Sequence, residues 1–191
     1  MNGLSYRVIP AITPDGIAYS GGINTTEMYN SLMHKFRWGG IEDEEVYLNE
    51  NSVRMFSNIR HNFASLAEAL AHEGKSDSAI HVLETCLELI PNSRIPFDVY
   101  MLGMVETYYK LGNEDRARDV AQQILSNTYA YVAYFLSLDP PFTNYLDLEK
   151  RLSAHALSEL IRISHSNGDK QFSAEIQQRL QEYGPALNAI F

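Results

Sequence analysis

Two glycines, Gly74 and Gly112, constrain the fold more than any other feature, because each stands between two helical stripes of apolar residues. Before Gly74 the stripe recurs every three or four positions, at Val53, Phe56, Ile59, Phe63, Leu66 and Leu70. This period keeps one face of a helix apolar, and glycine commonly ends a helix. After Gly74 a second stripe runs from Ala79 to Ile90 and stops at Pro91. Each glycine therefore predicts a turn between two antiparallel helices.

The rest of the chain extends this all-α prediction. Helical segments are expected at about 99–111, from 113 toward 136, at 146–166 and at 170–183, and Asp139-Pro140-Pro141 should break the chain. Residues 1–51 form an irregular N-terminal segment with one capping helix over 24–38, capped by Asn24 and stopped by Gly39-Gly40. The run at 4–9 could form a short strand. Residues 52–191 form the helical repeat domain.

The spacing around the two glycines resembles that of the tetratricopeptide repeat. The first repeat, at about 60–93, has the expected residue types at Phe63, Ala67, Gly74, Ala79 and Pro91, with small residues where the helices approach closely. The second, at about 98–131, matches less well and lies 38 residues further on (74 to 112). A third hairpin, at about 146–183 around Gly168, is degenerate. The resemblance implies an α-α superhelix of antiparallel hairpins.

Composition excludes several classes of protein. Fifteen basic and 24 acidic residues among 191 give a net charge of −9, so we expect no nucleic-acid partner. A single cysteine, Cys86, excludes an internal disulfide framework. No run approaches 18 apolar residues, so we expect no direct membrane insertion of this segment. Pro10 and Pro14 interrupt the N-terminus where a signal peptide would be apolar.

Motifs for chemistry are missing from the sequence. Glu68 and His72 share a helix face, as do His155 and Glu159, but a zinc-protease signature needs His-Glu-x-x-His, so no metal site is predicted. Cys86 falls on an apolar stripe, where a thiol is unreactive. There is no nucleophile elbow, phosphate loop or dinucleotide fingerprint. We therefore predict that the domain is not an enzyme and needs no cofactor.

Two surfaces are candidates for binding. A solenoid of helix pairs uses the faces of its first helices as a groove, which predicts contacts from His61, Glu68, His72, Glu106, Tyr109 and Lys110. The alternative is an aromatic surface that stacks on sugars, made of Trp38, Tyr129, Tyr131 and Tyr134. Both sets could instead be ordinary helix surface and packing, and Trp38 in particular could fix its helix onto the first hairpin.

The N-terminal third carries a more specific resemblance. Thr26-Glu27-Met28-Tyr29-Asn30 and Lys35-Phe36-Arg37-Trp38-Gly39-Gly40 precede Val46-Tyr47-Leu48-Asn49-Glu50. From about 6 to 138, this order resembles the soluble C-terminal region of a Bacteroidetes family of multi-pass membrane proteins. Their membrane portion is similar to protein O-mannosyltransferase-type glycosyltransferases. The resemblance implies a missing membrane portion and a place on the periplasmic face of the inner membrane. None of the family's presumed catalytic residues maps onto this chain.

These observations together predict a non-catalytic interaction or scaffold domain. Its partner would be a protein or peptide, with the membrane portion of the same chain as one candidate. A carbohydrate-binding accessory domain is the second hypothesis. A free-standing cytosolic tetratricopeptide adaptor, with Met1 as the native start, is the third.

Overall fold

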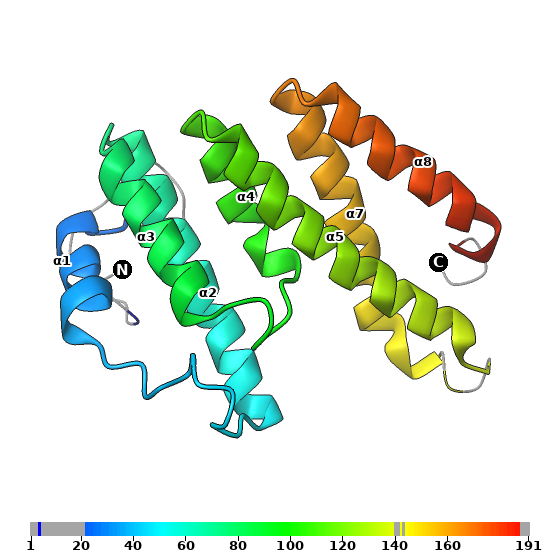
Figure 1. The fold of residues 1–191 in the computed structure, drawn as a ribbon, viewed down its shortest axis with the longest axis horizontal. Helices are drawn as coiled ribbons and strands as arrows, with labels where there is room; N and C mark the ends of the chain where they lie inside the picture. The colour runs from blue at the N-terminus through cyan, green and yellow to red at the C-terminus, as the bar shows by residue number, and fades with distance from the viewer. Residues whose placement is uncertain (1–3, 5–21, 140–141, 143, 188–191) are drawn as a thin grey trace. The chain divides into compact units, whose positions relative to one another are not determined.

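The computed structural model is all-α, and it describes residues 4, 22–139, 142 and 144–187 (Figure 1). Every regular element in these ranges is helical. Two predictions fall outside the described residues. One is the strand expected at 4–9, of which Leu4 alone is described, and the other is the diproline break at 140–141. The chain divides into two compact units, residues 1–95 and 96–191. Each unit is described by itself below.

The first unit contains one long helical hairpin and a shorter N-terminal helix. The hairpin consists of α2 (Glu50–His72) and α3 (Ser76–Leu89), which pack along each other. Helix α1 (Thr25–Asn30) is capped by Asn24, as predicted. The Oδ1 atom of Asn24 accepts the Glu27 N–H at 3.0 Å. A π-helical turn, η1 (Ser31–Lys35), continues α1. The hydroxyl of Thr25 donates to the Glu73 carboxylate at 2.9 Å, which ties α1 to the end of α2.

The N-terminal helix ends earlier than the sequence predicted. It stops at Lys35 because Phe36 turns extended (φ −74°, ψ 144°), so Gly39-Gly40 lies in the loop beyond it and does not end the helix. The extended segment brings Trp38 against Phe63 of α2, with ring centroids 5.5 Å apart. Ile41 is buried close by in sequence. Tertiary packing of these apolar side chains thus overrides the local helical pattern.

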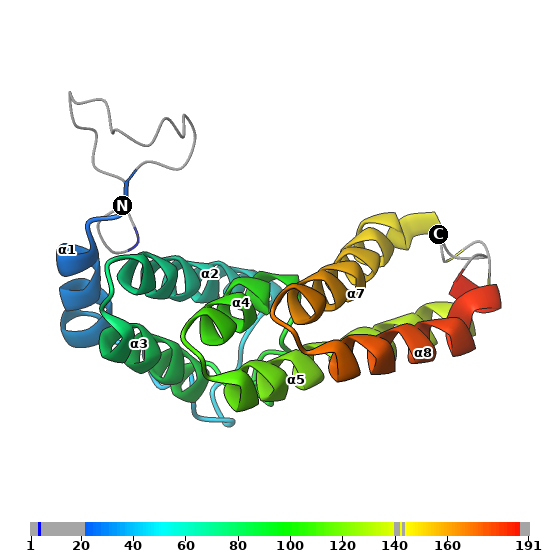
Figure 2. The ribbon, with the colours of Figure 1, turned by 90° about the horizontal axis from the view of Figure 1, so that it is seen from above.

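The second unit contains two hairpins. The first has a 3-10 turn, η2 (Val99–Met101), followed by α4 (Leu102–Lys110) and then α5 (Glu114–Ser137). The second has η3 (Asn144–Leu146), α7 (Asp147–Ser166) and α8 (Lys170–Leu187). Helix α5 runs unbroken to Ser137, close to the end near 136 that the sequence predicted. Within this unit α4 and α7 form one layer, and α5 and α8 form the other (Figure 2).

The three hairpins share one turn geometry. Gly74, Gly112 and Gly168 all have positive φ, of 74°, 72° and 85°. In each turn the glycine N–H donates to the carbonyl three residues back, and the next N–H donates five residues back, as Lys75 does to Leu70 at 2.9 Å. This is the Schellman arrangement, which satisfies carbonyls that the end of a helix leaves unpaired. It recurs without change because glycine alone adopts this conformation at no steric cost.

Burial repeats at fixed distances from these glycines. The residues eleven and eight positions before each glycine are buried in all three hairpins, namely Phe63, Leu66, Met101, Met104, Leu157 and Leu160. The small residue five positions after it is buried as well, as Ala79, Ala117 or Ser173. Small side chains there let the second helix of each hairpin approach the first. In α8 the repeat weakens, since Gln177 is exposed where Leu83 and Ala121 are buried.

Replacing Gly112 by alanine tests the turn. Apart from the adjoining backbone, no heavy atom of the described residues lies within 4 Å of the added Cβ, so the cost is that of the backbone conformation. We expect Gly112→Ala to lower the free energy of unfolding by about 1–2 kcal/mol. The matched control is Gly103→Ala, at an exposed position inside α4, where alanine should be neutral or stabilising. Urea unfolding followed by circular dichroism measures both, and equal stability of the two variants would contradict the assignment.

Candidate functional site

The polar residues predicted to form a groove belong to two helices in different units. His61, Glu68 and His72 are exposed on α2, and the Glu68 carboxylate lies 3.8 Å from Nε2 of His72. Glu106 and Lys110 lie on α4, with 3.8 Å between their charged groups. The pairs that the structure shows among the predicted residues are thus Glu68 with His72 on α2 and Glu106 with Lys110 on α4. Of the six predicted residues, five therefore occupy accessible helix surface.

Tyr109 is the exception, and its prediction as a groove residue was wrong. The side chain is 7% exposed, and its hydroxyl donates to Oδ2 of Asp169 at 3.0 Å. Burial and the hydrogen bond to this carboxylate raise the pKa of Tyr109 to about 12. Tyr109 directly precedes Lys110, and a step of one residue turns a helix by about 100°, which here points the ring into the unit. Tyr109 is thus a structural residue.

Asp169 is the centre of a buried polar cluster that sequence reasoning missed. Its Oδ2 accepts two hydrogen bonds from the Arg118 guanidinium, at 2.8 and 3.0 Å, besides that from Tyr109. Its Oδ1 accepts the Phe172 N–H at 3.2 Å and so caps α8. Burial alone would raise the pKa of Asp169, but the hydrogen bonds from Arg118, Phe172 and Tyr109 outweigh it and hold the pKa below its usual value. The cluster joins α4, α5 and the start of α8.

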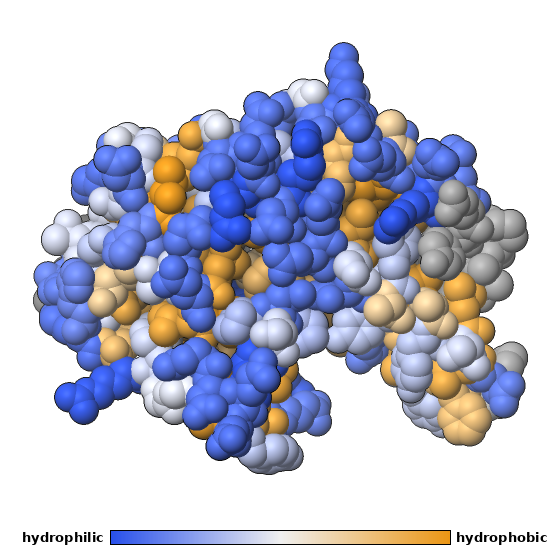
Figure 3. All heavy atoms as spheres, in the orientation of Figure 1, coloured by the Kyte–Doolittle hydropathy of each residue, from blue (hydrophilic) through white to orange (hydrophobic). Residues whose placement is uncertain are grey.

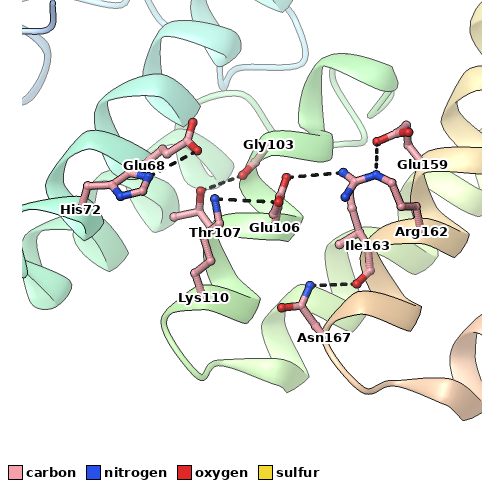
Figure 4. Close-up of polar contacts among 10 residues, drawn as sticks. All are labelled: Glu68, His72, Gly103, Glu106, Thr107, Lys110, Glu159, Arg162, Ile163 and Asn167. Carbon is pink, nitrogen blue, oxygen red and sulfur yellow. Dashed lines mark hydrogen bonds and ion pairs between the residues drawn. The ribbon is translucent and has the colours of Figure 1, made fainter. Parts of the chain in front are cut away.

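A second set of charges crosses between α4 and α7 on the surface of the second unit. Arg162 of α7 lies 3.7 Å from Glu106 of α4, and its Nε donates to Glu159 at 2.8 Å (Figure 4). Glu106 thus stands between Lys110 on its own helix and Arg162 on the neighbouring one. All four side chains remain partly exposed. We call Glu106, Lys110, Glu159 and Arg162 the α4–α7 polar face.

Arg162 was not among the predicted residues, although the sequence held a signal for it. It stands six positions before Gly168, as Glu68 stands before Gly74 and Glu106 before Gly112. Counting back from the third turn glycine would have placed it on the same face. Glu159 carries no such signal, because its role follows from its 2.8 Å contact with Arg162.

The predicted aromatic surface is divided by the structure. Tyr131 and Tyr134 are exposed on α5, at 47% and 56%. Tyr129 is buried, which corrects its prediction as a surface residue, and its hydroxyl donates to the Ile176 carbonyl at 3.4 Å. The Arg179 guanidinium lies 5.7 Å from its ring centroid. Trp38 is half-buried against Phe63 in the other unit.

Two further buried groups have structural surroundings. Arg60 is fully buried on α2, and its guanidinium donates to the carbonyls of Ile90 and Ile95 at 2.7 and 2.5 Å. The charge therefore satisfies carbonyls just beyond the end of α3, where the helix dipole favours a cation. Burial raises the pKa of the Cys86 thiol to about 12, although nearby Arg60 opposes this. Cys86 accordingly stays protonated at neutral pH.

No three His, Cys, Asp or Glu side chains among the described residues gather in a way that could hold a metal ion. Among the described helices, none has the length and apolar composition that a membrane-spanning helix requires. Comparison with family models, curated proteins and solved structures finds no match to this chain.

Replacing Asp169 by asparagine tests the buried cluster. The change leaves the Arg118 guanidinium without its anion, and we expect it to lower the free energy of unfolding by about 2 kcal/mol. Asp119→Asn is the control, because Asp119 pairs with Arg116 at 2.8 Å on the exposed side of α5 and should cost less than about 1 kcal/mol.

The same pair of variants should differ in pH dependence. Because the folded-state pKa of Asp169 lies below the ordinary value of 3.8 for an aspartate, its stabilisation is fully present above that value and is lost as the pH falls through the folded-state pKa. The Asp169→Asn variant should therefore lose less stability than the parent below about pH 4. Unfolding measured between pH 2 and 7 gives the result, and parallel curves for parent and variant would contradict it.

Proposed function

We propose that the chain is a non-catalytic protein-interaction or scaffold domain built of tetratricopeptide-like hairpins. The observation that supports this most is the recurrence of one turn, with the same hydrogen bonds and the same buried positions, in three hairpins. Repeat architectures of this kind present the first helix of each hairpin to a partner. The layer of α4 and α7 in the second unit is consistent with that arrangement (Figure 2).

The binding surface we propose is the α4–α7 polar face of the second unit, and the exposed residues of α2 form a separate candidate surface on the first. The charges of the α4–α7 polar face alternate in sign, with Glu106 and Glu159 set against Lys110 and Arg162. Exposed ion pairs of this kind contribute only about 0–1 kcal/mol to stability. The carboxylates and cations of a peptide can therefore replace them at little cost, and their charge-assisted hydrogen bonds would fix the peptide's register.

A charge exchange tests this surface. We would select binders from a displayed library of random 12-residue peptides on the full chain, and then compare their affinities for the exchange variant Glu106→Arg with Arg162→Glu. The exchange keeps the net charge and the possibility of a pair, but inverts the pattern that a peptide meets. We expect the selected peptides to bind the variant about tenfold more weakly.

The matched control is the exchange Arg116→Asp with Asp119→Arg on α5, which lies in the other layer. Binding should be unchanged there. A library that yields no binders with the parent chain would overturn the interaction function. Binders that respond to the α5 exchange and ignore the α4–α7 exchange would move the surface to the other layer.

We further propose that the domain is the soluble tail of a glycosyltransferase-like membrane protein and faces the periplasm. The sequence resemblance described above supports this, with the membrane portion of the same chain as a partner. An antibody against the domain, applied to fractionated native cells, should detect a band far above 21.7 kDa in the inner-membrane fraction. A soluble band at 21.7 kDa would instead support the free-standing cytosolic adaptor.

A carbohydrate-binding accessory domain is the second candidate function. The exposed rings of Tyr131 and Tyr134 on α5 favour it, because aromatic faces stack on sugar rings. Binding of a simple mannoside, in the absence of peptide binding, would distinguish this function from peptide recognition.

A further inference from the structure

The second unit contains an apolar pocket whose lining shares one residue, Tyr131, with the predicted surfaces. The pocket lies between η2, α5 and α7 and has a volume of about 210 Å³. Its apolar lining consists of Phe97, Val99, Tyr100, Tyr131, Leu152 and Ala156. Tyr100, Tyr131 and Leu152 are between 36% and 47% exposed, so apolar surface continues from the pocket to its mouth.

The local backbone holds this pocket open. Asn127 of α5 donates its side-chain amide to the Phe97 carbonyl at 2.9 Å, which fixes the segment before η2. Asp98 accepts the Tyr100 N–H at 3.0 Å and begins η2. In this segment the Phe97 side chain is buried, while the Tyr100 ring is 44% exposed. The pocket therefore belongs to the folded state of the unit and needs no rearrangement to form.

Its size favours a single side chain as the occupant. Pockets for drug-sized ligands are typically about 300–1,000 Å³, larger than this one. Protein interfaces, in contrast, commonly depend on one aromatic or aliphatic anchor that fills a small pocket, surrounded by contacts that exclude water. Other exposed apolar side chains lie nearby in sequence, at Tyr134, Phe142 and Tyr145. Figure 3 shows apolar atoms gathered where α5 ends and α7 begins.

The polar groups of the lining argue against a sugar. Thr128 already donates its hydroxyl to the Ile124 carbonyl at 2.8 Å, and Ser153 donates to the Glu149 carbonyl at 2.9 Å. A sugar bound here would have to find its hydrogen-bond partners among the remaining polar groups of the lining, and any hydroxyl left unpaired would cost free energy. An apolar side chain needs none of these hydrogen bonds.

The charge of the lining indicates which residues of the partner peptide should lie beside the anchoring side chain. Asp98 and Glu149 both line the pocket, and the lining residues that the structure describes include no cationic side chain. Lys150, on the following position of α7, is buried and lies 3.3 Å from Asp147. An anchor flanked by lysine or arginine would therefore complement this site, and one flanked by acidic residues would be repelled.

We infer that this pocket binds a partner peptide through one aromatic or long aliphatic side chain flanked by basic residues. The inference rests on the proposed interaction function and assigns it a second contact, separate in composition from the α4–α7 polar face. The two surfaces have complementary roles. The pocket supplies apolar burial, while the α4–α7 polar face supplies charged contacts.

Three synthetic peptides, acetylated and amidated at their ends, test the inference on the full chain. They are Ala-Lys-Phe-Arg-Ala, its alanine analogue Ala-Lys-Ala-Arg-Ala, and the acidic analogue Ala-Glu-Phe-Glu-Ala, with methyl mannoside as a fourth probe. We expect the first to shift the amide resonances of Tyr100, Tyr131 and Leu152, with a dissociation constant of about 1 mM or tighter. Both analogues should bind at least about fivefold more weakly.

Two variants and a matched control locate the binding. Leu152→Asp should weaken the phenylalanine peptide about tenfold, and Glu149→Lys should reverse the preference between the basic and acidic peptides. Leu148→Asp is the control, because Leu148 lies on the same helix, is 57% exposed and is not part of the pocket lining. It should leave the affinity unchanged.

The outcomes separate this inference from the proposed function. If the peptides leave the pocket resonances unshifted, or if Leu148→Asp and Leu152→Asp act alike, the pocket inference is overturned. The library selection on the α4–α7 polar face would still decide the interaction function. If the mannoside shifts the pocket resonances and the peptides do not, the pocket belongs to the carbohydrate alternative.

Discussion

The glycine turn that closes each hairpin is the constraint on which the rest of the structure depends. A helix that ends must satisfy its last carbonyls, and here the two N–H groups that follow the end of α2, α4 and α7 do so in the same way. Because this geometry fixes where the second helix begins relative to the first, the same positions counted from Gly74, Gly112 and Gly168 become buried. One local backbone conformation therefore determines the packing of three helix pairs.

Two buried charged side chains add hydrogen bonds between elements to this apolar packing. Arg60 connects α2 to the segment after α3 through backbone carbonyls, and Asp169 connects α4, α5 and α8 through Arg118 and Tyr109. A buried charge is tolerated only where partners surround it. Arg60 thus stabilises the first unit and Asp169 the second, each from within. Their partners also explain why Tyr109, which carries a polar group on a surface helix, is unavailable to a ligand.

The accessible part of the second unit offers two different kinds of contact. The α4–α7 polar face carries weakly held charges of both signs, while the pocket beside α5 carries apolar surface rimmed by Asp98 and Glu149. Interfaces that bind proteins commonly combine an apolar anchor site with a polar periphery. The two together are consistent with an interaction domain, and each can be removed by substitution without the other.

Helical period and glycine placement are local properties, so the helices, the three turns and most of the buried stripe could be predicted from the residues alone. The accessible positions of Glu68, Glu106 and Lys110 followed from the same period. The end of the first helix at Lys35, the burial of Tyr109 and Tyr129, and the cluster around Asp169 could not be predicted, because they depend on how the helices pack. Each of these depends on a neighbour distant in sequence, such as Phe63 for Trp38 or Arg118 for Asp169. A periodic pattern specifies which face of a helix is apolar, but the partner that covers a given side chain is set by how the helices pack.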